Sequence, residues 1–213
     1  MADTLDYAGM VALLTTAAER IKENRAYLSE LDSATGDGDH GTAIAKVAGA
    51  ITDTIAKAEG DDLKKLLKDI GWAAMSTDAG STSPLYGSLF VGMSRATPEQ
   101  GPIDAATLAE MLGSGVEKLR GNTRAQPGNK TMIDALVPAI DAIRSAADEG
   151  KGIDQMLADG ADAATRGAES TKDMKATFGR AKNIGERSIG HVDPGATSMA
   201  IFFTGLKEGL SNA

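Results

Sequence analysis

Residues 5–31 read LDYAGMVALLTTAAERIKENRAYLSEL, with apolar side chains recurring every three or four positions. Leu14, Ala18 and Ile21 would therefore lie on one face of a long amphipathic helix. The same spacing predicts seven further helices, around residues 44–55, 63–72, 85–93, 108–119, 132–143, 153–171 and 199–206. No segment shows the alternation of apolar and polar residues that a half-buried strand requires.

The composition is typical of packed helices rather than sheets. Only 4% of the residues are aromatic, whereas alanine is abundant and there are 9 methionines. Strands favour β-branched and aromatic residues, which are the types in short supply here. Short turns between eight helices favour antiparallel neighbours. We therefore expect one all-α domain over residues 1–213, an eight-helix antiparallel up-and-down bundle or barrel.

Some details of these helices can also be predicted. Gly60 is expected to end the second helix, and Trp72 is expected on the apolar face of the third. Asp104 or Thr107 is expected to cap the fifth helix, because short polar side chains accept hydrogen bonds from the first free N–H groups.

Charge and cysteine content exclude several classes of protein. A formal net charge of −8 opposes binding to nucleic acid or to an anionic membrane, since both carry dense negative charge. The absence of cysteine excludes a disulfide framework and thiolate metal sites. The N-terminus has no basic segment followed by an apolar run, and no window approaches about 18 consecutive apolar residues. We expect a soluble cytoplasmic protein.

Four connections are unusually rich in Gly, Asp, Ser and Pro: residues 32–42, 78–88, 121–132 and 179–198. They follow the first, third, fifth and seventh expected helices. Alternate connections of an up-and-down bundle lie at the same end, so these four should meet. The sequence therefore predicts a site built from loops on a rigid helical scaffold.

The first connection contains two motifs that do not fit their usual structures. Gly36, Gly38 and Gly41 match the spacing of a dinucleotide-binding loop, but that loop follows a strand and here a helix precedes it. Counted from Asp37 as an EF-hand loop, the twelfth position holds Ala48 instead of the bidentate glutamate. Neither interpretation is kept.

A magnesium site explains the same connection better. Asp32, Asp37 and Asp39 lie within eight residues, and the glycines between them let the carboxylates converge. Mg²⁺ is usually held by a few carboxylates together with substrate phosphates. The alternative is that one aspartate caps the next helix and the others are solvated turn residues. Three aspartates together favour the metal.

The other three connections carry groups suited to phosphate. Ser81 and Thr82 precede a helix, where N–H groups and hydroxyls attract anions, although an ordinary N-cap would look the same. The third connection, which includes Arg124 and Lys130, either brings positive charge or a backbone wall to a nucleotide or is an ordinary helix–helix turn. Arg180 could stabilise charge on a phosphoryl group in transfer.

Taken together, the four connections resemble the L subunit of dihydroxyacetone kinase, and the resemblance extends over essentially the whole chain. The matching motifs are Asp32 with Gly36-Asp37-Gly38-Asp39-His40-Gly41, Ser83-Pro84-Leu85-Tyr86-Gly87, Pro127-Gly128-Asn129-Lys130-Thr131-Met132, and Gly185-Glu186-Arg187-Ser188 with Asp193-Pro194-Gly195-Ala196. Asn129 stands where the family usually has aspartate, and Thr123 where glycine is usual.

The resemblance implies an eight-helix barrel that binds ADP or ATP through Mg²⁺, with two ions expected. By position, Asp32, Asp37 and Asp39 would be the metal ligands, and Arg180 would be the catalytic residue. The implied nucleotide contacts are His40, Gly41, Thr42, Ala43, Ser81, Thr82, Thr123, Met132, Arg180, Asp193, Pro194 and Gly195.

In that family the ketose is held by a separate K subunit, and phosphoryl transfer takes place across the interface. The implied function is the Mg–nucleotide subunit of a kinase acting on dihydroxyacetone or a similar small ketose. The donor would be ATP or a phosphotransferase-system M protein that rephosphorylates bound ADP. A homodimer is also open. The alternatives are a non-catalytic Mg–nucleotide module that signals to a protein partner, and a helical scaffold without a ligand.

Overall fold

The computed structural model describes residues 4–213. The first three residues of the N-terminal stretch considered for a signal peptide lie outside this range. Within it, none of the helices combines the length and apolar character needed to cross a membrane. The fold class agrees with the prediction, since nearly all regular structure is helical.

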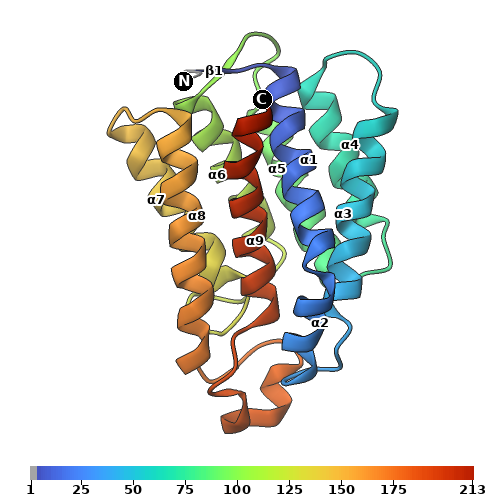
Figure 1. Cartoon of the computed structure of the whole chain (residues 1–213), viewed down its shortest axis with the longest axis vertical. Coiled ribbons are helices and arrows are strands. Elements are labelled where there is room, and N and C mark those ends of the chain that lie inside the picture. The colour runs from blue at the N-terminus through green and yellow to red at the C-terminus, as the bar shows by residue number, and fades with distance from the viewer. Residues whose placement is uncertain (1–3) are drawn as a thin grey trace.

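The described residues form nine α-helices; α2 continues in the direction of α1, and from α2 onwards the helices run alternately up and down (Figure 1). They are α1 (Tyr7–Glu23), α2 (Arg25–Ser33), α3 (His40–Lys57), α4 (Leu63–Met75), α5 (Thr82–Ala96), α6 (Ala105–Arg120), α7 (Ile133–Asp148), α8 (Ile153–Ser170) and α9 (Pro194–Gly209). Short 3₁₀ helices lie between α8 and α9, at Thr171–Asp173 and Ala181–Ser188, and after α9, at Leu210–Asn212. The expected eight helices are all present, the first of them divided into α1 and α2.

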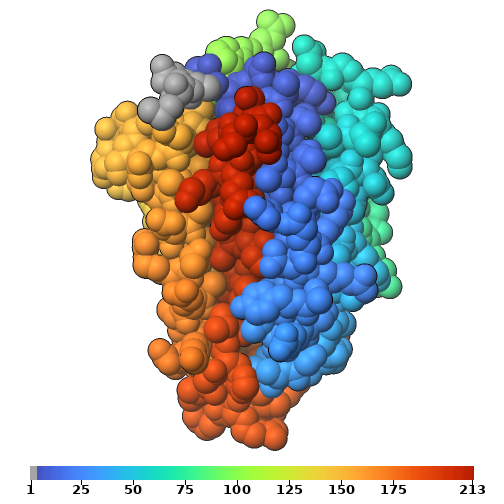
Figure 2. Space-filling model, in the orientation of Figure 1, coloured from blue at the N-terminus to red at the C-terminus, as the bar shows by residue number. Residues whose placement is uncertain are grey.

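Successive helices pack side by side, and α9 packs against α1, so the helices form a closed ring. In Figure 2 the side chains of α9 lie between those of α8 and α1 along the viewed face. The interior is filled by one continuous cluster of buried apolar residues. Phe202 of α9 is at its centre, with edge-to-face ring contacts to Tyr86, Phe90 and Phe203 at centroid distances of 6.1, 6.2 and 5.9 Å.

The first expected helix is interrupted at Asn24. The side chain of Asn24 donates a hydrogen bond to the carbonyl oxygen of Arg20 at 2.8 Å, which competes with the helical pattern. Asn24 takes φ −91° and ψ 10°, and α2 begins at the next residue, Arg25. Sequence spacing could not reveal this break, because the apolar period continues across it.

Three further expectations need correction. Trp72 was expected on the buried face of its helix but is 56% exposed, because Leu67, Ile70 and Ala74 form the buried face and Trp72 lies on the other side of α4. α3 ends at Lys57, before Gly60, and Gly60 lies in the following connection with φ 78°.

A two-residue strand pair was not expected: β1 (Thr4–Leu5) pairs antiparallel with β2 (Ile103–Asp104). Two residues are too few to show an alternating pattern. Asp104 caps α6, as one of the two predicted alternatives.

Glycines let neighbouring helices approach closely around the ring. A Cβ placed on Gly92 of α5 would lie 2.6 Å from the Cα of Gly115 on α6, closer than real side chains allow. The backbone of α6 would have to move to accommodate it. Gly49 of α3 is different, since nothing lies within 4 Å of its would-be Cβ.

We predict opposite effects of alanine at these two glycines. Gly92→Ala should lower the free energy of unfolding by about 1–3 kcal/mol, the usual cost of overpacking. Gly49→Ala should raise it by about 0.5–1 kcal/mol, because alanine favours the helix and nothing obstructs it. Urea denaturation of both variants beside the wild type checks this. Equal stability of the two variants would mean that α5 and α6 are not held at this separation.

Candidate functional site

The four glycine-rich connections meet at one end of the ring, opposite the C-terminus (Figure 1). They line a cavity of about 590 Å³. Its charged lining consists of five carboxylates and three cationic side chains, namely Asp32, Asp37, Asp39, Asp78, Asp193, Lys46, Lys130 and Arg180. Because acids outnumber bases, an anionic ligand would need a metal ion between itself and this wall.

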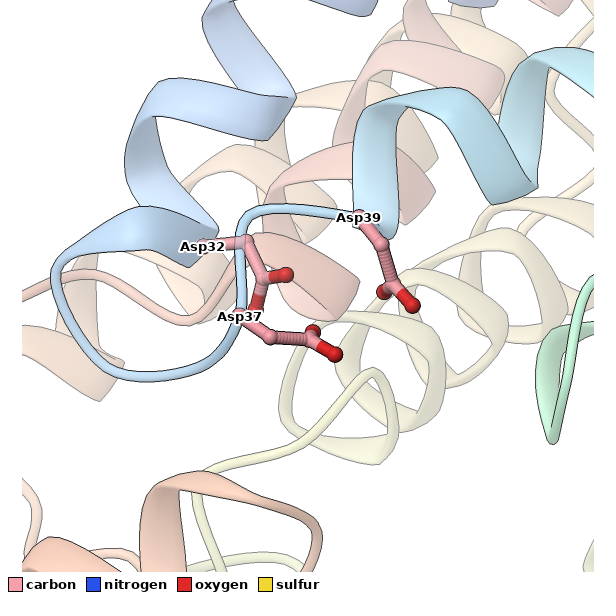
Figure 3. A group of neighbouring side chains, drawn as sticks. All are labelled: Asp32, Asp37 and Asp39. Atoms are coloured by element: carbon pink, nitrogen blue, oxygen red, sulfur yellow. The ribbon is translucent and has the colours of Figure 1, made fainter.

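Three of these carboxylates lie close to one another in the cavity wall (Figure 3). Asp32 is in the last turn of α2 and is buried, Asp37 is in the connection, and Asp39 directly precedes α3. One oxygen from each lies within 4.8 Å of the others. Asp32 is fixed further by accepting a hydrogen bond from the backbone N–H of His40 at 3.1 Å.

This arrangement fits Mg²⁺. The ion binds oxygen at about 2.0–2.1 Å, so opposite ligands are about 4 Å apart. Oxygens already within 4.8 Å of one another would reach such positions by small side-chain rotations. Gly36 contributes to this geometry, because a Cβ there would collide with the carboxylate of Asp32. The donor set therefore could hold a magnesium ion.

Arg180 is the cation closest to these acids. Its guanidinium pairs with the carboxylate of Asp37 and lies 3.3 Å from that of Asp39. The arginine comes from the long connection between α8 and α9, whereas the aspartates come from the connection between α2 and α3. The side chains involved are all more than half exposed, so each pair contributes little to stability.

The cavity also receives four helix N-termini. Because α3, α5, α7 and α9 all start at this end, the positive ends of their dipoles face the cavity. The helices α3, α5 and α7 have no side-chain hydrogen bond at their N-caps. The fourth, α9, is capped by Asp193. Of the helices that start at the far end, α1, α4 and α6 are each capped by an aspartate, whereas α8 has no side-chain cap. At α3 and α5 the lack of a cap leaves backbone N–H groups of the first turn available to an anion, whereas at α7 the N–H of Ile133 donates to the hydroxyl of Thr131 at 3.2 Å.

Comparison with known proteins decides the family. The DAK2 domain model matches residues 34–208. The PEP-dependent dihydroxyacetone kinase 1 ADP-binding subunit DhaL of Listeria innocua is 37% identical over 200 residues, which cover 94% of this chain and 95% of that protein. The chain belongs to the DAK2 domain family. The PEP-dependent dihydroxyacetone kinase ADP-binding subunit DhaL of Escherichia coli is 31% identical, and the match covers 92% of this chain and 93% of the E. coli protein. These matches confirm the resemblance found from the four connections.

A solved structure shares this DAK2 fold. The dihydroxyacetone kinase of C. freundii in complex with AMP-PNP and Mg²⁺ superposes with a TM-score of 0.71 at 28% sequence identity. The match covers 94% of the present chain but only 33% of that kinase chain. The DAK2 domain therefore spans about a third of the longer protein.

The structure brings almost all of the predicted site residues of the DAK2 domain to one place. The cavity is lined by Asp32, Asp37, Asp39, His40, Thr42, Ala43, Ser81, Thr82, Thr123, Met132, Arg180, Asp193, Pro194 and Gly195. Gly41 is the exception. A Cβ on Gly41 would collide with the backbone of α2, including the nitrogen of Ser29 at 2.7 Å, so this glycine serves the close packing of α2 on α3.

Several lining residues were not predicted. Tyr86 and Leu85 lie in the first turns of α5, Ser198 lies one turn into α9, and Lys46 lies one turn beyond Thr42 on α3. Helical spacing from the predicted residues could have found Ser198 and Lys46. The hydroxyl of Tyr86 is buried without a hydrogen-bond partner among the described residues, which no sequence pattern indicates.

Two titratable groups lie deep in the cavity. Asp193 caps α9 by accepting a hydrogen bond from the N–H of Ala196 at 2.7 Å, and burial raises the pKa of its carboxyl to about 7. His40 is 3.0 Å from the hydroxyl of Ser198, and burial lowers its pKa although Asp32 opposes this. Burial therefore favours the neutral form of His40.

The raised pKa predicts a pH dependence of stability. An unfolded aspartate has a pKa of about 3.9, so between about pH 4 and pH 7 the folded protein holds a proton that the unfolded chain has released. The free energy of unfolding should therefore fall as pH rises across this window, by at most about 1.4 kcal/mol per pH unit from this group. Asp193→Asn should reduce that fall, since the amide does not titrate.

Urea denaturation of the ligand-free protein from pH 5 to pH 8 measures this slope. The matched control is Asp104→Asn, the same change at the exposed cap of α6, where hydrogen bonds from Thr107 lower the carboxyl pKa. That variant should keep the wild-type slope, because its group contributes only at lower pH. If Asp193→Asn also kept the wild-type slope, the carboxyl of Asp193 would be charged over the whole range from pH 5 to pH 8.

Proposed function

We propose that this chain is the Mg–nucleotide subunit of a dihydroxyacetone-type kinase. It would bind ADP or ATP in the cavity and transfer a phosphoryl group to a small ketose held on a separate K subunit. The observation that carries the proposal is the cavity itself, in which three converging carboxylates face four helix N-termini. This combination suits a magnesium-bridged polyphosphate and few other ligands.

The relatives support the same assignment. Two of them are named as ADP-binding subunits of a dihydroxyacetone kinase, and the related kinase structure is a complex with AMP-PNP and Mg²⁺. In the present chain Asp32, Asp37 and Asp39 would hold the magnesium. The ion would neutralise phosphate charge and orient the phosphates for transfer.

The chain's own residues would divide the work of binding. The N–H groups at the starts of α3, α5 and α9 would contact phosphate oxygens, and Arg180 would stabilise charge on the phosphoryl group in transfer. Ala79, Leu85, Ala125, Met132 and Ile133 form an apolar part of the lining and would receive the base. Phosphoryl transfer would then depend mostly on positioning and electrostatics, with the acceptor supplied by the partner subunit.

The names of the relatives favour one phosphoryl donor. Both DhaL relatives are called PEP-dependent and ADP-binding. We therefore propose that ADP stays bound as a coenzyme and is rephosphorylated by a phosphotransferase-system protein, rather than being exchanged for ATP after each turnover.

Native mass spectrometry of the purified protein, before and after dialysis against ATP and Mg²⁺, tests binding and donor together. Co-purified ADP that does not exchange supports the coenzyme proposal. An empty protein that takes up ATP indicates an ATP-dependent kinase. A protein that binds neither nucleotide with Mg²⁺ present overturns the proposed function. Turnover of dihydroxyacetone with an added K subunit then separates a kinase subunit from a non-catalytic module.

Substitution of Asp37 should separate binding from folding. Asp37→Asn should weaken the affinity for Mg–ADP by at least about tenfold, because a charged ligand of the ion is lost. The ligand-free protein should unfold within about 0.5 kcal/mol of the wild type, since Asp37 is exposed and one of three mutually repelling charges.

Calorimetric titration and urea denaturation measure the two effects. Asp53→Asn on the exposed face of α3 removes the same charge away from the cavity. It should change neither the affinity for Mg–ADP nor the free energy of unfolding. Loss of folding in the Asp37 variant would assign this aspartate a structural role instead.

A further inference from the structure

The segment that carries Arg180 is a closed loop. We call residues 172–190 the Arg180 loop; it connects Thr171, after α8, with His191, before α9. The backbone N–H of Gly190 donates to the carbonyl of Lys172 at 2.7 Å, which joins the two ends. Inside the loop the N–H of Ala176 donates to the hydroxyl of Ser188 at 2.9 Å. The loop thus has a fixed base.

A lysine from another connection completes that base. The ammonium of Lys130 donates to the carbonyl oxygen of Thr171 at 2.5 Å and also to that of His191. These two carbonyls flank the Arg180 loop on either side. Lys130 itself is only 1% exposed, so its side chain has no alternative position in solvent. One buried ammonium therefore joins both ends of the loop to the turn before α7.

This placement of a lysine is energetically unfavourable in isolation. A buried ammonium is costly unless it is hydrogen-bonded, and burial lowers the pKa of Lys130. The carboxylates of Asp193, Asp134 and Asp173 oppose that shift and stabilise the charge. Lys130 also has φ 60°, a conformation that non-glycine residues rarely adopt. Such a residue persists when surrounding contacts hold it in place.

The turn that carries Lys130 is itself held firmly. The carboxylate of Asp134 accepts hydrogen bonds from the N–H groups of Gly128 at 2.5 Å and Thr131 at 2.7 Å. The N–H of Thr177, within the Arg180 loop, donates to the carbonyl of Asn129 at 3.3 Å. The turn that carries Lys130 is thus anchored to α7, and the ammonium joins this turn to both ends of the loop.

We propose that Lys130 is a positioning residue, which holds the base of the Arg180 loop so that the guanidinium of Arg180 lies beside Asp37 and Asp39. It acts on the bound nucleotide through Arg180 and not by contact of its own ammonium, whose buried hydrogen bonds to the two carbonyls would have to break first. The inference rests on the proposed function, because it concerns how the nucleotide site is assembled.

The first test needs no ligand. Lys130→Met keeps the aliphatic stem and removes the ammonium. Hydrogen exchange should become at least about tenfold faster at residues 172–193 and stay unchanged in α3 to α5. Lys172→Met, at an exposed lysine of the same loop, should leave exchange unchanged. Unchanged exchange in the Lys130 variant would overturn the proposal whether or not the protein binds nucleotide.

The second test is a double-mutant cycle with Arg180→Ala, read as the Kd for ADP in the presence of Mg²⁺. Lys130→Met should weaken ADP binding about tenfold in the wild type and less than twofold in the Arg180→Ala background, since Arg180 is no longer there to be positioned. A merely structural role predicts the same loss in both backgrounds, and that result would overturn the proposal.

Two further outcomes are distinguishable. If Lys130→Met does not fold, Lys130→Gln is used in the same two tests, because its amide retains hydrogen-bond donors without the charge; the expected effects are the same in direction and smaller. If wild-type protein binds no ADP with Mg²⁺, the proposed function fails, while the exchange experiment still decides whether Lys130 holds the loop.

Discussion

The alternating direction of the chain is the constraint on which the site depends. Because every second connection returns to the same end of the ring, the helices α3, α5, α7 and α9 all begin there. Their N-termini give that end of an acidic protein a local positive potential, without requiring many basic side chains. The carboxylates of Asp32, Asp37 and Asp39 then supply the opposite charge at one point of the same cavity.

These two charge systems place opposite demands on a ligand. The helix ends favour an anion, whereas the three carboxylates repel one another and favour a cation. A magnesium-bridged phosphate satisfies both at once, and neither a bare metal nor a bare anion does. Without a ligand the site therefore lowers the stability of the folded protein, which is common where binding geometry is preformed. Arg180 offsets part of this by lying between Asp37 and Asp39.

Much of the fold and of the site could be predicted from the sequence, and the features that could not all depend on contacts between distant parts of the chain. The helices, the meeting of the four connections and the aspartate cluster follow from local spacing. The break at Asn24, the exposure of Trp72 and the burial of Lys130 depend on what packs against them. Lys130 belongs to the connection that either brings charge to a nucleotide or is a plain turn, and its partners are 41 and 61 residues further along the chain. No local pattern specifies such contacts.

The two sides of the cavity are held by different means, and this explains why a buried lysine is tolerated. The aspartates are fixed by helices, since Asp32 ends α2 and Asp39 precedes α3. Arg180 precedes only the 3₁₀ segment Ala181–Ser188, which is broken at Gly185, and an arginine on a free loop would lose entropy each time it met a phosphate. Tying the loop at its base moves that entropy cost from binding to folding. A buried ammonium can do this because it satisfies two carbonyls with one group, and a shorter or uncharged side chain would join them less firmly.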